Sequence, residues 1–173
     1  MVTASGAPTA STAPTARQVA ETVTDPELPV LTLADLGVLR EVTERPDGLV
    51  VVAITPTYTG CPAIEAMRDD LRARLAEEGF TRVEIRTVLD PPWTSDWISA
   101  AGREKLRAAG IAPPSPAPPS GGPVNLGPIH RLVRCPRCGS ADTVTLSAFG
   151  STACKSLHRC HACGEPFERV KEI

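Results

Sequence analysis

The chain has 173 residues, of which 42% are hydrophobic and 22% are charged. That length allows one ordinary domain or two small ones, and no stretch approaches the roughly 18 apolar residues that a membrane-spanning helix needs. Basic and acidic residues nearly balance, at 18 against 20, and only 3% of residues are aromatic. A dedicated nucleic-acid-binding protein usually has a basic excess and aromatic platforms, so this composition argues against one.

The first 14 residues are rich in Ala, Thr, Ser and Pro and carry no charged side chain. They contain no run of large apolar residues that could pack, so we expect a disordered tail. The same segment lacks the basic start and apolar core of a secretory signal. The expected location is therefore cytoplasmic, where cysteines bind metals or do chemistry more often than they form disulfides.

A proline- and glycine-rich stretch divides the rest of the chain. Residues 112–127 contain six prolines and the adjacent pair Gly121 and Gly122, a composition typical of a linker. The linker separates a first domain, over residues 15–111, from a second domain over residues 128–173.

The first domain is predicted to be α+β, beginning with a short helix over residues 16–22. Strands over residues 38–43 and 49–55 flank the turn Arg45-Pro46-Asp47-Gly48 and read as a hairpin. The second of these strands is apolar on both faces, so it should lie in the interior of a sheet.

A longer helix is expected over residues 62–78, ended by Gly79. Its apolar residues recur at three- and four-residue steps and form one buried stripe; they are Ile64, Met67, Leu71 and Leu75. A half-buried strand over residues 82–89 and a helix over residues 98–109 follow. Together these elements predict a small sheet covered by helices on one face.

The strongest chemical signal lies in the second domain, where two CxxC pairs are separated by 21 residues. The pairs are Cys135 with Cys138 and Cys160 with Cys163. Two residues between thiolates let both reach one ion from a tight turn, and two such turns joined by a hairpin complete a tetrahedral site. With strands over residues 143–149 and 157–159, this segment reads as a small all-β zinc ribbon. The metal should supply much of its stability, because about 50 residues build only a small core.

Structural zinc is the preferred occupant of these four cysteines, and two alternatives stay open. Two disulfides could join the same residues, although a cytoplasmic location disfavours them. An iron–sulfur cluster could use the same four thiolates. A catalytic zinc would need an open coordination position, which four cysteines do not leave.

Cys61 stands apart from the ribbon, between the predicted interior strand and the helix that follows it. Pro62 fits the first helical position, which would place the Cys61 thiol near unpaired backbone N–H groups and the positive end of the helix dipole. Both favour the thiolate, so we expect a lowered pKa and a candidate for cluster transfer. The alternative is a small buried residue that fills the corner between strand and helix.

Cys154 lies at the expected tip of the ribbon hairpin, next to Lys155. The lysine would favour the thiolate, which makes Cys154 a second candidate for cluster transfer, as a ligand that exchanges; the alternative is an incidental thiol. His158 and His161 flank the second CxxC pair. We expect both to face the solvent, because four cysteines already saturate the ion.

Trp93 and Trp97 lie in a proline-fixed loop after the last strand of the first domain. Tryptophan covers much area at little entropic cost, so both are partner-binding candidates; the alternative is a lid over the domain's own core. Asp25 and Glu27 are further partner-binding candidates. Together with Asp35, they could converge near the strand ends and assist metal binding. The alternative is that each is a helix-cap or turn residue.

Several of these motifs resemble known families. Asp25-Pro-Glu-Leu-Pro29, Asp35-Leu-Gly37 and Gly60-Cys61-Pro62 resemble the small domain shared by cytosolic iron–sulfur assembly factors and the bacterial maturation protein SufT. Together with residues 90–97, residues 110–114 and the ribbon segments, they make the chain similar to the PaaD family over residues 16–173. That family accompanies the multicomponent phenylacetyl-CoA 1,2-epoxidase.

The resemblance implies aerobic phenylacetate catabolism, with the di-iron oxygenase and the iron–sulfur flavin reductase of that system as partners. The chain itself has no Glu-x-x-His pairs for a di-iron site and no GxGxxG for a dinucleotide. We therefore expect no catalytic activity of its own. The preferred hypothesis is an accessory or maturation protein that assists iron–sulfur or iron centre assembly in its partners, with Cys61 and Cys154 holding a transient iron–sulfur cluster or iron.

Two other functions stay open. A non-catalytic structural subunit could remain bound to the epoxidase complex through the zinc ribbon and the loop that carries Trp93 and Trp97. A nucleic-acid-binding ribbon would depend on seven basic against four acidic residues in residues 128–173. That excess is too small to favour it, so we expect neither a nucleic-acid nor a membrane partner.

Overall fold

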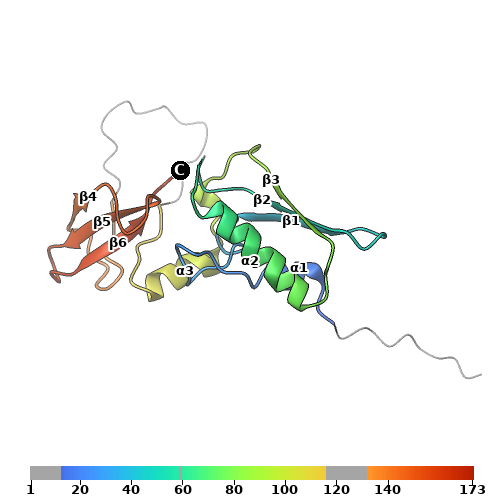
Figure 1. The fold of residues 1–173 in the computed structure, drawn as a ribbon. Coiled ribbons are helices and arrows are strands. Elements are labelled where there is room, and N and C mark those ends of the chain that lie inside the picture. Colours follow the sequence, from blue (N-terminus) through green and yellow to red (C-terminus); the bar gives the residue numbers. More distant parts are fainter. Residues whose placement is uncertain (1–12, 59, 116–131) are drawn as a thin grey trace, which may run out of the picture.

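The computed structural model describes residues 13–58, 60–115 and 132–173. Most of the predicted tail and of the predicted linker, residues 1–12 and 116–127, lie outside the described residues. Figure 1 shows two sheets, the first covered by helices and the second a small ribbon beside it. The predicted α+β domain followed by an all-β ribbon is confirmed. In the part of the chain described, no helix is both long and apolar enough to cross a bilayer.

The first sheet contains three strands in the order β1-β2-β3, so the apolar strand lies in the centre, as predicted. The strands are β1 (Leu39–Glu44), β2 (Val50–Ile54) and β3 (Val83–Thr87). β1 pairs antiparallel with β2, and β2 pairs parallel with β3. The parallel pair requires a crossover, which helix α2 (Ile64–Glu77) provides. The loop that carries Cys61 therefore leaves the carboxyl end of the central strand.

Two helices cover one face of this sheet and contact each other, α1 (Ala16–Ala20) and α2. Met67, Leu71 and Leu75 of α2 are fully buried and Ile64 is partly buried, which confirms the predicted stripe. The helix begins at Ile64, two residues later than predicted, because Ala63 is its cap residue.

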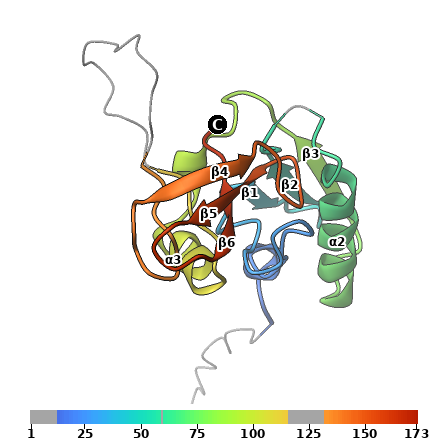
Figure 2. The ribbon, with the colours of Figure 1, turned by 90° about the vertical axis from the view of Figure 1, so that its left-hand side faces the viewer.

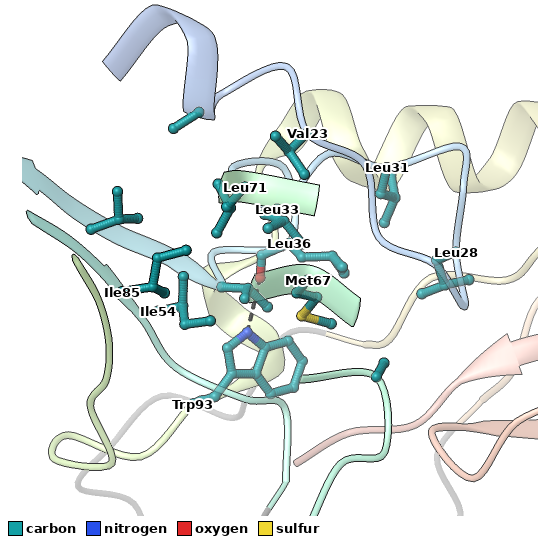
Figure 3. Packing of buried hydrophobic residues seen from close by; sticks show 14 of the residues in the cluster. Val23, Leu28, Leu31, Leu33, Leu36, Ile54, Met67, Leu71, Ile85 and Trp93 are labelled. Atoms are coloured by element: carbon teal, nitrogen blue, oxygen red, sulfur yellow. Dashed lines mark hydrogen bonds between the residues drawn. The ribbon is translucent and has the colours of Figure 1, made fainter. Parts of the chain in front are cut away.

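The loop between α1 and β1 closes the core from a second side. Leu31, Leu33 and Leu36 are buried there in the same cluster as Met67 and Trp93, and Leu36 lies beside both (Figure 3). A short 3₁₀ helix (Ser95–Trp97), which the sequence analysis did not predict, leads into α3 (Ala100–Ala108).

Gly37 explains the close approach of the two loops that meet beside the core. Its φ of +71° lies in the left-handed region, and a Cβ there would stand 2.6 Å from the Cβ of Trp97. Only glycine accommodates both conditions. The neighbouring Asp35 carboxylate accepts a hydrogen bond from the Lys105 ammonium at 2.6 Å, which ties the same loop to α3.

The second sheet is an antiparallel ribbon in the order β4-β5-β6. Its strands are β4 (Thr143–Ser147), β5 (Lys155–Cys160) and β6 (Pro166–Val170). The sequence analysis missed β6. The strand begins with a proline and carries two charged residues in five, so its apolar residues do not show a two-residue period.

The two sheets are joined through β6, and Figure 2 shows the ribbon in front of the first domain. The Ala112 N–H donates to the Glu168 carbonyl at 2.8 Å, and the Val170 N–H donates to the Ala112 carbonyl at 3.0 Å. Val170 is buried in the core of the first domain. Ala112, the first residue of the predicted linker, therefore extends the ribbon sheet as a parallel bridge.

Candidate functional site

The ribbon brings four sulfur atoms together at one end of its sheet. The Sγ atoms of Cys135 and Cys163 are 3.7 Å apart, and those of Cys138 and Cys160 are 3.5 Å apart. Four sulfurs around a zinc ion, each about 2.3 Å from it, lie roughly 3.8 Å from one another. A disulfide needs about 2.05 Å, and all six cysteines are free thiols. The spacing thus fits a metal ion and excludes the disulfide alternative in this structure.

The two CxxC turns share one backbone conformation. Gly139 and Gly164 adopt positive φ angles of 73° and 78°, and each N–H donates to the carbonyl of the first cysteine of its turn at 2.9 Å. This turn directs backbone N–H groups at the sulfurs. A hydrogen bond from the Cys163 backbone lowers the pKa of the Cys160 thiol to about 7. Among the described residues, only these four cysteines bring three or more possible ligand atoms within 4.8 Å of one another.

The two histidines near the second CxxC turn differ in their surroundings. His161 is exposed, as expected, and its Nδ1 lies 3.0 Å from Asp142. The expectation was wrong for His158, which is buried, lies 2.9 Å from the Ser156 hydroxyl and stacks on Phe167. Its place on the inner face of β5 explains this burial. Neither histidine joins the sulfur cluster.

Cys61 is buried, with 4% of its surface exposed. Burial raises the pKa of its thiol and outweighs a hydrogen bond from the Ala63 backbone, which lowers it; the nearby Glu27 and Asp25 charges raise it further. The predicted lowered pKa is therefore wrong, and the burial fits the alternative of a small residue that fills the corner between strand and helix. The helix-end contribution exists, but a hydrophobic and acidic environment dominates it.

Cys154 lies in the same environment, although it comes from the other sheet. It is 8% exposed, and its Sγ is 3.6 Å from a Glu27 carboxylate oxygen. Burial raises the pKa of its thiol, and the Glu27 charge raises it further. A hydrogen bond from Thr152 lowers the pKa but is outweighed. Lys155 does not stabilise the Cys154 thiolate as predicted, because its ammonium pairs with the Glu168 carboxylate at 2.9 Å.

Both thiols and both acidic residues line one small cavity between the first domain and the ribbon, with a volume of about 20 Å³. That is roughly the room of one ordered water molecule. Met67 and Trp93 contribute apolar surface to the cavity. The cavity joins the elements that the sequence analysis had treated as two separate candidates for cluster transfer.

Asp25 organises the acidic side of this cavity. Its carboxylate accepts hydrogen bonds from the backbone N–H groups of Glu27 at 2.9 Å and Leu28 at 2.7 Å. Burial raises its pKa, and these two hydrogen bonds oppose the rise. Of the three acidic residues expected to converge, Asp25 and Glu27 do so, while Asp35 instead pairs with Lys105.

Tyr58 and Lys171 also belong to this neighbourhood, and the sequence analysis missed both. The pKa of Tyr58 is raised by burial and by the Cys61, Glu27 and Cys154 charges. Lys171 lines the cavity, and its ammonium donates to the Ala153 carbonyl at 2.9 Å. Tyr58 could have been suspected from its place three residues before Cys61. Lys171 gave no signal, because only the fold of β6 brings it near.

The two tryptophans are not equally placed for binding a partner. Trp93 is 5% exposed, and its indole N–H donates to the Leu36 carbonyl at 2.9 Å (Figure 3). Trp97 is half-buried, with the Arg40 guanidinium 3.6 Å from its ring centre. Trp93 therefore fits the alternative of a lid over the domain's own core, while Trp97 keeps part of its surface accessible.

The burial of the two cavity thiols predicts slow alkylation. In the native chain at neutral pH, we expect iodoacetamide to modify Cys61 and Cys154 much more slowly than in the unfolded chain, because burial blocks access of the reagent and the raised pKa of each thiol leaves less thiolate. The rates should rise with pH as the thiols ionise. Mass spectrometry of the native chain, with the denatured chain as control, measures both rates. Equal rates in the two states would contradict the buried geometry.

Two family models match separate parts of the chain. One, described as the PaaD zinc beta ribbon domain, matches residues 121–171. The other, described as an iron-sulfur cluster assembly protein, matches residues 15–91. The two matches coincide with the ribbon and with the part of the first domain that carries Cys61.

Individual relatives follow the same division. A protein of Escherichia coli, named as one of the subunits of 1,2-phenylacetyl-CoA epoxidase, is 46% identical over 151 residues, which covers 87% of each chain. A protein of Porphyromonas gingivalis named as an Fe-S protein maturation auxiliary factor is 37% identical over 79 residues, covering 45% of this chain and 74% of that protein. A crystal structure of a domain of unknown function from Bacillus anthracis is 27% identical, with a TM-score of 0.49, and covers 53% of this chain and 87% of that one.

Proposed function

Because this chain belongs to the PaaD family, which includes a named component of phenylacetyl-CoA epoxidase, we propose that it is an accessory protein that assists assembly of iron–sulfur or iron centres in its partners. The partners in this proposal are the oxygenase and the iron–sulfur flavin reductase of the epoxidase system. The ribbon holds a structural zinc, and the cargo is iron or an iron–sulfur cluster. The chain performs no catalysis of its own in this scheme.

One observation carries the proposal. Cys61, from the domain that matches iron-sulfur cluster assembly proteins, and Cys154, from the ribbon, line the same cavity with Asp25 and Glu27. Thiolates and carboxylates are ligands for iron, and a structural four-cysteine zinc site would not need a second set. The cavity therefore supports a role in which the metal is held and passed on.

The buried thiols suit temporary retention. Without cargo, both thiols hold their protons, since burial and the acidic neighbours raise the pKa of each and disfavour thiolate. An arriving cation replaces those protons and removes the penalty on negative charge. After release, the cavity returns to its protonated state, in which the thiols resist oxidation. The ribbon cysteines, saturated by zinc, take no part in the exchange.

Replacing Cys61 with alanine tests the function. We expect the Cys61→Ala chain to fold, because alanine fills most of the site of a small buried residue, while the co-expressed reductase is purified largely without its iron–sulfur cluster. Iron and acid-labile sulfide in the reductase measure the effect. A matched control is Ala63→Ser, which leaves every thiol in place. Full cluster content in the presence of Cys61→Ala would refute the proposal.

A second function is favoured by a different observation, the exposed apolar face of the ribbon. Leu146 of edge strand β4 is 52% exposed and Phe149 just after it is 66% exposed. Exposed apolar side chains beside an unpaired strand edge are typical of a docking surface. A non-catalytic structural subunit would use this surface to remain in the epoxidase complex. Co-purification in fixed stoichiometry that Leu146→Ser abolishes, with Cys61→Ala fully active, would favour this alternative.

A further inference from the structure

We propose that the interdomain cavity is a composite site for a single divalent transition-metal ion, ligated by the Cys61 and Cys154 sulfurs and the Glu27 carboxylate. The inference rests on the proposed function and specifies its cargo as one ferrous ion rather than a preformed cluster. Each of the two domains supplies part of the ligand set, so neither domain alone makes the site. Three features of the cavity support this proposal, namely its size, its ligands and the way those ligands are held.

The size of the cavity decides between an ion and a cluster. Its volume of about 20 Å³ matches one water molecule, and a bare divalent cation is smaller than that. Even the smallest iron–sulfur cluster contains two irons and two sulfides, which would require Met67 and Trp93 to leave their places in the core. Trp93 is fixed by its hydrogen bond to Leu36. An ion of that size leaves Met67 and Trp93 in their places.

The ligand set selects the kind of ion. Two sulfurs with one carboxylate are too soft for magnesium or calcium, and they suit ferrous iron, cobalt and zinc. Ferrous iron binds more weakly than zinc in the general order of divalent metals. A ferrous ion at a three-ligand site can therefore be released, whereas zinc at the four ribbon cysteines stays.

The charges around the cavity include two acidic residues, Asp25 and Glu27, which both face it. Lys171 also lines the cavity, with its ammonium bound to the Ala153 carbonyl and lying over the Phe149 ring, while Lys155 pairs with Glu168. Binding exchanges two thiol protons, which leave to the solvent, for one divalent cation. The net charge of the buried site is the same before and after this exchange, so burial does not oppose it.

Two fixed elements position the ligands. The Asp25 carboxylate anchors the backbone of Glu27, and the Lys171 N–H donates to the Cys154 carbonyl at 2.9 Å, which ties Cys154 to β6. Glu27 and Cys154 already approach to 3.6 Å. The Cys61 sulfur is farther away, because among the described residues only the ribbon cysteines bring three ligand atoms within 4.8 Å of one another. Cys61 must therefore move toward Glu27 and Cys154 as the ion binds.

A cobalt titration tests the site in the full chain. The chain is first loaded with one equivalent of zinc, and Co²⁺ is then added without oxygen. We expect one further equivalent to bind and to produce sulfur-to-cobalt charge-transfer absorption. Loss of any one proposed ligand should weaken cobalt binding by roughly 100-fold, in Cys61→Ser, Cys154→Ser or Glu27→Gln. Loss of a group that only supports a ligand typically weakens metal binding by about 10- to 100-fold, so loss of a ligand should have at least the larger of these effects. Glu104→Gln, an exposed carboxylate on α3, is the matched control and should bind like the wild type.

A separate pair of variants tests Asp25, to which we assign the role of positioning Glu27. Asp25→Ala should weaken cobalt binding by roughly 10- to 100-fold. Asp25→Asn should restore most of the affinity, since its amide oxygen still accepts the Glu27 and Leu28 N–H groups. Zinc retained at one equivalent in every variant shows that the ribbon is folded. If Asp25→Asn binds as weakly as Asp25→Ala, the positioning role is wrong.

Two outcomes overturn the ion site while leaving the proposed function standing. In the first, Cys154→Ser binds cobalt like the wild type, while Cys61→Ala still deprives the reductase of its cluster. In the second, anaerobic loading with iron and sulfide deposits equal amounts of both at Cys61. Conversely, cobalt binding that needs all three ligands, together with full reductase maturation by Cys61→Ala, would leave the ion site intact and remove the proposed function.

Discussion

Replacing Cys160 with serine is expected to unfold the ribbon and release its metal. Cys160 is fully buried and supplies one of four sulfurs, so three ligands and a weaker oxygen donor would remain. Structural zinc contributes an apparent binding free energy of about 10–16 kcal/mol in small zinc-dependent folds. Among the residues that the structure describes, the ribbon's own buried cluster contains four, Ala112, Cys135, Cys160 and Phe167. A core of that size cannot hold the three strands together without the ion.

The loss should extend beyond the ribbon. Val170 of β6 is buried in the core of the first domain, and the Ser95 N–H donates to the Ile173 carbonyl at 3.1 Å. When the ribbon unfolds, these contacts are lost and the cavity beside Cys61 opens. We therefore expect the Cys160→Ser chain to show a lower melting temperature for the first domain and rapid alkylation of Cys61.

Hydrogen exchange and metal analysis measure these effects together. Amides of β4, β5 and β6 should exchange without protection in Cys160→Ser, and zinc content should fall below one equivalent. His161→Gln is the control, because His161 adjoins Cys160 but is exposed and outside the sulfur cluster. Its stability should remain within about 0.5 kcal/mol of wild type. Protected strands in a zinc-free Cys160→Ser chain would contradict the metal dependence.

The second large effect concerns Trp93. We expect Trp93→Ala to lower the free energy of unfolding by about 3–5 kcal/mol, because it removes a large buried ring from the core. Trp93→Phe keeps an aromatic ring but leaves the buried Leu36 carbonyl without its donor, which costs about 1–3 kcal/mol. Urea denaturation of both variants gives the two values.

Trp97→Ala provides the comparison for this prediction. Trp97 is half-buried and contacts Arg40 at the surface, so its loss should cost less stability than the loss of Trp93. A docking role for Trp93 predicts the reverse pattern, with wild-type stability and weakened binding to the proposed partners. The two results separate a core residue from a partner-binding residue.

Local patterns predicted most of the fold. The apolar run in residues 49–55 became the central strand, and the stripe of Met67, Leu71 and Leu75 became the buried face of α2. Both signals are short-range, because the two-residue and 3.6-residue periods are read within one element. β6 escaped prediction for the opposite reason. Its residues show no two-residue period that would mark a strand, and its bridge to Ala112 joins residues far apart in the chain.

The candidate site was predicted residue by residue but not as a whole. The spacing of the ribbon cysteines sufficed to predict their cluster, because both pairs lie in local turns. For Cys61, the position at a strand end was right and the predicted thiolate was wrong. Its burial depends on Cys154 and Val170, which arrive from residues more than 90 positions away in the chain. No local pattern encodes that contact, so only the fold could show it.

The order in which the chain is made follows from the position of β6. Domains generally fold from the amino-terminal end during synthesis, so the first domain emerges before the strand whose Val170 completes its core. Until the ribbon has acquired its ion, the sulfur of Cys61 lacks its cover. Zinc-starved cells should therefore accumulate newly made chains in which this sulfur is open to peroxide, so the supply of the ribbon's metal would control when the interdomain cavity is complete.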